Sequence, residues 1–268
     1  MSRPSGPGPV APSAGPGAPG GPDRPAAAPS VVRLGVVDST QAVAFALAEQ
    51  GAPDRTVVVA EHQTAGRGRR GRRWLDEPGA SLLVSILVRP RLEVARWPLL
   101  SLTAAVATAE ALTAAAGVAA RLDWPNDVLV GGRKVAGVLL ESRVGPAPVV
   151  VVGIGVNVAQ TRFPPELAGL ATSLALAAGR AVDREAVLAA LLDRFDDWRD
   201  RLEREGFAPV RARWLALAAI LGRRVTVEGR TGVAVDLDAD GALVLVDGPV
   251  RHRVVAGELT GGGAEGLR

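Results

Sequence analysis

EHQTAGRGRRGRRW, residues 61–74, lies between two apolar runs at 56–60 and 80–88. Short runs of branched apolar residues predict buried β-strands, so the quoted stretch is a loop between two core strands. Five arginines and three glycines fall within residues 66–73. Glycine lets a backbone approach a ligand closely, and guanidinium groups make planar contacts to phosphate or carboxylate. The pattern predicts a cationic loop that repels itself and stays mobile until an anion binds.

Composition limits the classes of protein and of site. The chain has 268 residues, 48% of them hydrophobic, which suffices for one large globular domain plus a small one. It has no cysteine and two histidines, His62 and His252, so disulfides and thiolate nucleophiles are excluded and a histidine-rich metal centre is not expected. We find no apolar run of the roughly 18 residues that a membrane span needs and no signal peptide, and we expect a cytoplasmic location.

Rare residues mark positions where substitution is chemically difficult. Of 31 basic side chains, Lys134 is the single lysine, and Asn126 and Asn157 are the only asparagines. A chain that otherwise uses arginine for its cations has retained a compact ammonium at one position. All three residues fall in motif-like contexts.

Domain boundaries follow from composition. Residues 1–30 contain nine prolines and six glycines and are expected to be disordered. Residues 31–221 contain both predicted strands and predicted helices. We expect an α+β domain with a central mixed β-sheet and flanking helices. Residues 222–260 contain short strands at 223–228, 231–237, 242–246 and 250–255, typical of a small SH3-like β-barrel. Residues 261–268 are expected to form a flexible tail.

Polar residues with possible ligand contacts also occur before the arginines of the loop. Ser39 and Thr40 precede a predicted helix at 41–50, where a hydroxyl is most often a helix N-cap. The alternative is a hydroxyl pair beside free N–H groups that receives a polar ligand. Gln63 ends the strand before the loop and offers both a donor and an acceptor, which suits a urea or amide group. A long helix is predicted at 97–116, with Pro98 near its first position.

A second chemical stretch spans residues 121–141. It predicts a strand, a Gly-Gly hairpin at 131–132 and a return strand that starts with Lys134. Pro125 interrupts a regular ladder, and a bulge there would push Asn126 and Asp127 towards a pocket. The structural alternative is a polar hairpin with an edge proline. Gly153 and Gly155, on a later strand, allow close approach of a planar ligand or simply dense packing.

These motifs together resemble the biotin protein ligase family, whose members activate biotin with ATP. The resemblance covers about residues 31–260, and several motifs in order are more specific than any one. The segments that carry it are Asp38-Ser39-Thr40, Gln63 through Trp74, Trp124-Pro125-Asn126-Asp127, Lys134 through Leu139 with Glu141, and Gly153 through Asn157. Two positions depart from the family pattern: Asp123 stands where a lysine is usual, and Gln41 where asparagine is common. Arg121 is a candidate to replace the missing cation or to pair with Asp123.

The resemblance implies roles for named residues. Lys134, Arg67 and Arg69 are expected to be catalytic, neutralising the biotin carboxylate and the α-phosphate of ATP. The expected biotin-binding residues are Ser39, Thr40, Gln41, Gln63, Arg67, Gly68, Arg69, Trp74, Lys134 and Gly137. The expected ATP-binding residues are Arg69, Arg72, Trp74, Asn126, Lys134, Gly155 and Asn157. Asp127 is the expected ligand of Mg²⁺.

The implied reaction forms biotinyl-5′-AMP and transfers biotin to a lysine of a biotin carboxyl carrier domain of an acyl-CoA carboxylase. The resemblance is to members without a DNA-binding domain and is compatible with a homodimer. Three other functions stay open at this point. They are a lipoate or octanoate ligase of the same superfamily, a nucleic-acid-binding module that uses the arginine-rich loop, and a non-catalytic biotin-binding regulator.

Overall fold

The computed structural model describes residues 29–257, 259 and 260. Of the expected tails at 1–30 and 261–268, residues 1–28 and 261–268 lie outside that part of the chain. A seven-stranded sheet forms the larger domain, in the order β1-β2-β3-β7-β6-β5-β4. Only β1 and β2 pair in parallel, so the sheet is mixed, as expected. Its strands are β1 (Val31–Val37), β2 (Val57–Gln63), β3 (Ser81–Val88), β4 (Ala120–Asp123), β5 (Asp127–Val130), β6 (Arg133–Arg143) and β7 (Val149–Asn157).

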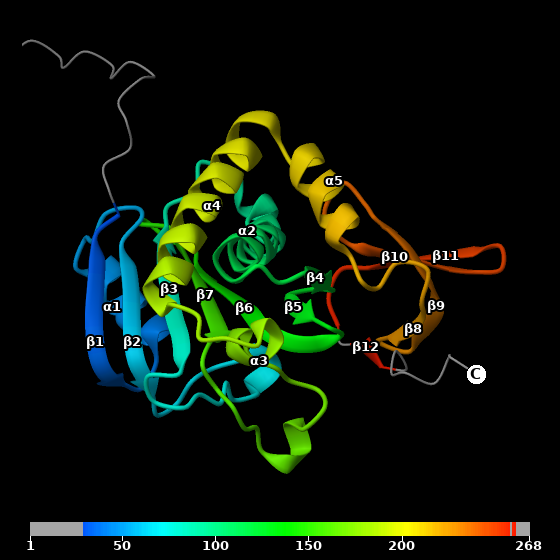
Figure 1. Ribbon diagram of the computed structural model, residues 1–268. Coiled ribbons are helices and arrows are strands. Elements are labelled where there is room, and N and C mark those ends of the chain that lie inside the picture. Colours follow the sequence, from blue (N-terminus) through cyan, green and yellow to red (C-terminus); the bar gives the residue numbers. More distant parts are fainter. Residues whose placement is uncertain (1–28, 258, 261–268) are drawn as a thin grey trace, which may run out of the picture.

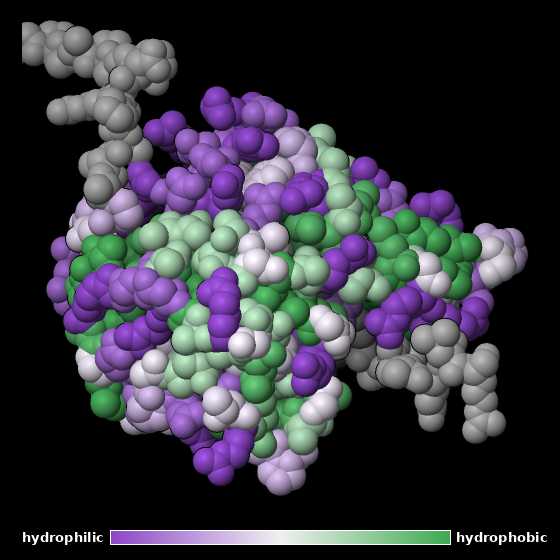
Figure 2. Space-filling model, viewed as in Figure 1, coloured by the Kyte–Doolittle hydropathy of each residue, from purple (hydrophilic) through white to green (hydrophobic). Residues whose placement is uncertain are grey.

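Helices cover both faces of this sheet (Figure 1). On one face, α1 (Thr40–Glu49) packs Ala44 and Phe45 against Val58, Leu87 and Val151. The other face carries α2 (Leu99–Ala116) and α4 (Arg184–Glu205), which pack against each other. The short α3 (Leu174–Ala178) and the helix α5 (Ala208–Leu217) complete the domain. Hydrophilic residues gather over the upper end of α4, where its charged face meets solvent (Figure 2).

The central helix α2 is built almost entirely from alanine, leucine, valine and threonine. It begins two residues later than predicted, because Trp97 ends a preceding 3₁₀ turn (Val94–Arg96) and Pro98 is the N-cap. Gly117 ends it in the left-handed region, at φ 73°. The expectation that no segment is long and apolar enough to cross a membrane is wrong, since residues 94–116 meet both criteria. That segment is mostly buried between the sheet and α4, as in the core helix of a soluble protein.

A second, five-stranded antiparallel sheet follows α5, in the order β11-β10-β9-β8-β12. The strands are β8 (Arg224–Val227), β9 (Arg230–Leu237), β10 (Leu243–Asp247), β11 (Val250–Val254) and β12 (Leu259–Thr260). The predicted strands are confirmed to within one or two residues, because Gly229, Gly241 and Gly248 supply the positive φ angles of the connecting turns. Together the two sheets confirm the α+β fold with a small C-terminal β-domain.

The two domains share one apolar core. Buried residues of the small sheet, such as Val225 and Leu245, belong to the same cluster as α2 and the large sheet. The linker also covers the free edge of β4, where the Ala219 N–H donates to the Leu122 carbonyl at 2.8 Å. The small domain is therefore packed firmly against the large one.

A buried ion network ties α4 to the start of β2. The Arg199 side chain is 7% exposed and donates to Asp54 at 2.8 Å and to Glu203 at 3.1 Å. It also donates to the Arg89 carbonyl at 3.4 Å. A buried guanidinium with three acceptors is stabilising chiefly because removing it leaves those acceptors unpaired.

We therefore expect Arg199→Ala to lower the free energy of unfolding by about 3–4 kcal/mol. Arg194→Ala is the matched control on the same helix, since Arg194 is 43% exposed and should change stability by less than about 0.5 kcal/mol. Urea denaturation of both variants measures the difference. A loss below about 1 kcal/mol in Arg199→Ala would contradict the stabilising role of this network.

Candidate active site

The arginine-rich loop is a hydrogen-bonded hairpin. Gly68 N–H donates to the Arg72 carbonyl at 2.7 Å, and Trp74 N–H donates to the Gly66 carbonyl at 3.0 Å. The expected self-repulsion is offset by acceptors on other elements. Arg67 contacts Glu141 of β6, Arg69 contacts the Asn126 side-chain oxygen at 3.3 Å, and Arg70 contacts Glu228.

This loop, together with Leu139 and Glu141, lines a cleft of about 450 Å³. One wall carries the guanidinium groups, and the other is the β6 strand. Glu141 is 33% exposed there and accepts from Arg67 at 3.1 Å. Its Oε2 also accepts from Gln41 Nε2 at 2.8 Å. Glu141 is in a motif of the sequence, but its ionic partner could be found only from the fold.

Two paired glycines make room for the Trp74 ring. Gly137 of β6 and Gly155 of β7 are cross-strand neighbours. A Cβ atom at Gly155 would lie 2.5 Å from the Trp74 ring, and one at Gly137 would lie 3.2 Å from it. The Lys134 Nζ lies 5.8 Å from the centre of the same ring. The structure thus brings together Trp74, Lys134 and the two glycines, which sequence reasoning placed in one site.

The Lys134 ammonium forms an ion pair with Asp127 Oδ1 at 2.7 Å, and both side chains are about one-third exposed. The hairpin before them differs from the prediction of one bulged strand. β4 ends at Asp123 and β5 begins at Asp127, with a cis Trp124–Pro125 peptide in the turn between them. Asn126 is fixed in this turn, because its Nδ2 donates to the Val138 carbonyl at 2.6 Å.

A buried polar cluster lies where α1 begins. Gln63 Oε1 accepts from Thr40 N at 2.8 Å and from Thr40 Oγ1 at 3.0 Å. Ser85 of β3, which sequence analysis missed because nothing marks a serine on a buried strand, donates to Thr40 Oγ1 at 2.8 Å. Ser39 occupies the N-cap position but makes no capping hydrogen bond with its side chain. Its Oγ is buried without a partner in the described part of the chain, so it is available to a ligand.

Gln41 and Asn157 are both buried amides used within the protein. Gln41 lies against Gly153, where an added Cβ would approach its side chain to 3.0 Å. Asn157 Nδ2 donates to the Thr172 carbonyl at 3.0 Å and so holds the segment that follows β7. Gly68 and Arg72 lie in the loop backbone hairpin described above.

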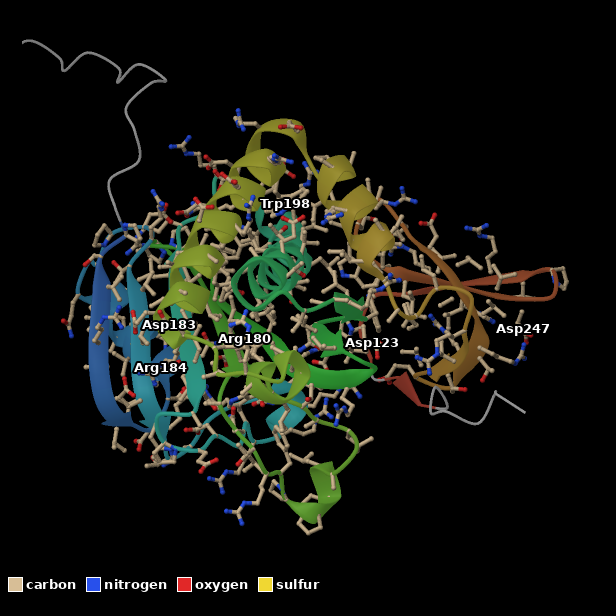
Figure 3. The ribbon with its side chains drawn as sticks, in the orientation of Figure 1. Asp123, Arg180, Asp183, Arg184, Trp198 and Asp247 are labelled. Atoms are coloured by element: carbon tan, nitrogen blue, oxygen red, sulfur yellow. The ribbon has the colours of Figure 1, made fainter. Side chains whose placement is uncertain are left out.

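Asp123 is a half-buried carboxylate beside the small domain (Figure 3). Its Oδ1 has no hydrogen-bond partner among the described residues. Burial raises the pKa of Asp123 to about 6, the nearby Asp127 carboxylate raises it as well, and Arg223 opposes both. Arg121 donates to the Ala218 carbonyl at 2.7 Å instead of pairing with Asp123. Arg121 therefore does not pair with Asp123, and the cations whose charges lower the pKa of Asp123 are Arg223 and Lys134.

The donor set near Asp127 suits Mg²⁺ that also binds phosphates, although the described residues contain no group of three or more metal-ligating His, Cys, Asp or Glu side chains. Asp127 and Asp123 face each other across the β4–β5 hairpin, and Asn126 lies in the turn between them. Mg²⁺ usually binds one or two carboxylates together with substrate phosphates and water. The residues present fit such an ion.

Comparison with known proteins extends these observations. Residues 34–157 match the biotin/lipoate A/B protein ligase family, and residues 220–259 match the biotin protein ligase C-terminal domain. A biotin–[acetyl-CoA-carboxylase] ligase of Paracoccus denitrificans is 42% identical over 86% of this chain and 100% of that protein. A ligase of the same description from Mycobacterium tuberculosis is 39% identical, over 82% of this chain and 85% of that protein. The structure of a biotin protein ligase from Aquifex aeolicus in complex with biotin and ATP has a TM-score of 0.77 and 31% identity, covering 86% of this chain and 97% of that chain.

We expect Gly155→Ala to displace the Trp74 ring, because the added methyl group would lie 2.5 Å from it. The measurement is tryptophan fluorescence. The spectrum of each protein's Trp74→Phe counterpart is subtracted from its own spectrum, so that the difference spectrum reports the emission of Trp74. The difference spectrum should shift to the red as the ring gains exposure. Gly145→Ala is the control, since nothing lies within 4 Å of a Cβ there. Identical difference spectra would show that the glycine pair does not seat the ring.

We also expect Asp123→Asn to stabilise the protein at pH 7.5. The pKa of Asp123 in the folded state, about 6, exceeds its ordinary value of 3.8, so the folded protein binds this proton more tightly than the unfolded chain. Stability from this group is therefore present below about pH 4 and lost as the pH rises through 6. The variant should gain about 1–3 kcal/mol at pH 7.5 and nothing near pH 4.

The measurement is urea denaturation of wild type and Asp123→Asn across this pH range. Asp193→Asn serves as the control, because Asp193 is an exposed aspartate on α4. A stability difference that does not change with pH would contradict the assigned burial of the Asp123 charge.

Proposed function

Because this chain belongs to the biotin protein ligase family, we propose that it is an ATP-dependent biotin–carboxyl-carrier-protein ligase. One observation carries the proposal: two cations, Arg67 and Lys134, lie beside a strand pair whose glycines seat the Trp74 ring, next to the cleft lined by the arginine-rich loop. The two relatives from Paracoccus denitrificans and Mycobacterium tuberculosis are matched over most of their length, and both are described as biotin ligases. This favours biotin over lipoate as the substrate. Three arginines of the loop, Arg67, Arg69 and Arg70, are engaged by carboxylate and amide groups of this chain, which argues against a nucleic-acid surface.

The reaction has two steps. In the first, a biotin carboxylate oxygen attacks the α-phosphorus of ATP, the bond to the bridging oxygen breaks, and pyrophosphate leaves. In the second, the ε-amine of a carrier lysine attacks the acyl carbon of biotinyl-5′-AMP, forming an amide and losing a proton as AMP leaves. No covalent enzyme intermediate is needed, which agrees with a chain that lacks cysteine.

Lys134 and Arg67 are the cations that allow two anions to meet in the first step. Each forms an ion pair with an internal carboxylate, Asp127 and Glu141 respectively. These internal anions fix the positions of the two cations. Substrate carboxylate and phosphate groups compete for the same charges, so little reorganisation is needed when they bind.

The ring system of biotin fits the polar cluster at the start of α1. Gln63 and Thr40 are already oriented by hydrogen bonds, and Ser39 offers a buried hydroxyl without a partner in the described residues. A ureido group supplies both N–H donors and a carbonyl acceptor for such groups. Gln41 and Gly137 limit the space beside it, and Gly68 lies in the loop that closes over it.

The nucleotide lies on the side of Trp74, Gly155 and Asn126 in this proposal, with Arg69 and Arg72 on its phosphates and Asn157 shaping the wall behind. Mg²⁺, held by Asp127, would neutralise phosphate charge when bound. Asp127 and Lys134 now compensate each other's charge. If Asp127 held Mg²⁺ and Lys134 contacted a substrate phosphate, both charges would still be compensated.

The acceptor is a biotin carboxyl carrier domain of an acyl-CoA carboxylase, and the enzyme works in the cytoplasm. We propose domain limits of 31–221 for the catalytic domain and 222–260 for the C-terminal domain. A homodimer is compatible with β1, which is an edge strand within the described part of the chain.

We expect Lys134→Ala to reduce biotin-dependent ATP–pyrophosphate exchange by about 100-fold or more, because the charge between carboxylate and α-phosphate is lost. Arg133→Ala, at the exposed neighbouring position on the same strand, is the matched control and should retain exchange. Lipoate in place of biotin tests the related ligase activity. Exchange that requires lipoate, or full activity in Lys134→Ala, would refute the assignment.

A further inference from the structure

One ion pair joins the arginine-rich loop to the C-terminal domain. Arg70 donates to Glu228, which lies 158 positions later in the chain. Both side chains are about half exposed, at 49% and 48%. Exposed ion pairs usually contribute little to the free energy of unfolding. We therefore expect a local effect of this pair on the loop.

Backbone conformation singles out the same two residues. Within the described part of the chain, three residues other than glycine have a positive φ: Arg55, Arg70 at 55° and Glu228 at 49°. Residues with a side chain avoid this region because Cβ crowds the backbone. Two of the three therefore form the two ends of one contact between domains. Unfavourable backbone conformations persist where the surrounding structure holds them, and they occur often at functional sites.

The turn that carries Glu228 would favour another residue. Glu228 and Gly229 connect β8 to β9 with positive φ at both positions, which matches a type I′ hairpin turn. Asparagine, aspartate or glycine is preferred at the first position of such a turn. The chain beyond β11 also leaves space for the longer side chain. At Gly257, an added Cβ would lie 2.9 Å from Glu228 Cγ and 3.3 Å from its carboxylate.

Arg70 is well placed to transmit this contact. It lies between Arg69, which contacts Asn126, and Gly71, in the 3₁₀ turn at the tip of the loop. A fixed Arg70 restricts the backbone on both sides of it. Arg70 itself lines the cleft, together with Arg67 of the same hairpin and Glu141 of β6.

We propose that Glu228 is a positioning residue, through which the β8–β9 turn of the C-terminal domain holds the arginine-rich loop closed over the cleft. This inference rests on the proposed function for its consequence: a closed loop retains biotinyl-5′-AMP until the carrier lysine arrives and protects the mixed anhydride from water. The closure itself is a property of the substrate-free protein and can be tested separately.

Glu228→Asn is the informative variant, because it removes the carboxylate contact and supplies a residue that the turn prefers. Glu228→Gln keeps the side-chain length without the charge. Asp247→Asn is the matched control. Asp247 is 47% exposed, pairs with Arg224 in the same small domain, and lies away from the catalytic domain in Figure 3.

The first measurement is the rate at which trypsin cuts the loop after Arg67, Arg69 or Arg72 in the substrate-free protein. We expect two- to fivefold faster cleavage in Glu228→Asn and Glu228→Gln than in wild type, the range of an exposed ion pair. Asp247→Asn should match wild type. The melting temperature of Glu228→Asn should not fall, which separates loss of loop closure from loss of folding. Unchanged cleavage in both Glu228 variants would overturn the proposal.

The second measurement is the release rate of biotinyl-5′-AMP, formed from biotin and ATP without carrier and chased with excess biotin. We expect two- to fivefold faster release in Glu228→Asn, with pyrophosphate exchange nearly unchanged. The double variant Arg70→Glu with Glu228→Arg should return release towards the wild-type rate. Failure of this rescue would overturn the role of the ion pair. If wild type shows no biotin-dependent exchange, the proposed function fails, while trypsin cleavage still tests the closure.

Discussion

Compensation of positive charge is the constraint on which the site depends. Five arginines within eight residues can form an ordered hairpin only if anions or strong acceptors lie close by. The protein supplies them from three separate elements: Glu141 from β6, Asn126 from the β4–β5 turn and Glu228 from the C-terminal domain. The loop is therefore a product of the tertiary structure, since no segment of the chain could hold it alone.

The register of two strands provides the second half of the site. Gly137 and Gly155 are opposite each other in the β6–β7 pair, so a shift of either strand by one residue would place an alanine, a valine or an isoleucine under the Trp74 ring. Lys134 lies three residues before Gly137, an offset that would put the two on opposite faces of a regular strand. The pairing of β5 with β6 shifts register at this point, and the Lys134 ammonium lies near the same ring. The core that fixes this register, including Val138 and Ile154, lies on the opposite face against α2.

Sequence reasoning succeeded where local patterns are strong. The limits of β3 and the start of β6 were predicted to within one residue, because apolar runs and the Gly131-Gly132 turn define them. It failed at Trp124–Pro125, where a proline produced a turn between two strands instead of a bulge in one. The residues that were missed, Ser85 and Glu228, act through partners 45 and 158 positions away. The polar cluster at Ser39 was left ambiguous for the same reason, since a capping hydroxyl and a ligand-binding hydroxyl look alike until hydrogen bonds are seen.

The small C-terminal domain takes part in the site at two separate points. Glu228 contacts Arg70 on the loop, whereas the charge of Arg223 acts on Asp123 beside the β4–β5 turn. Asp123 stands where the family resemblance leads one to expect a lysine, and it adds a negative charge next to Asp127. Above its pKa of about 6 the two carboxylates repel each other and both attract nearby cations. The charges of Lys134, from the larger sheet, and of Arg223, from the small domain, both lower the pKa of Asp123. A change in how the two domains pack would therefore alter the electrostatics around Lys134 as well as the position of the loop.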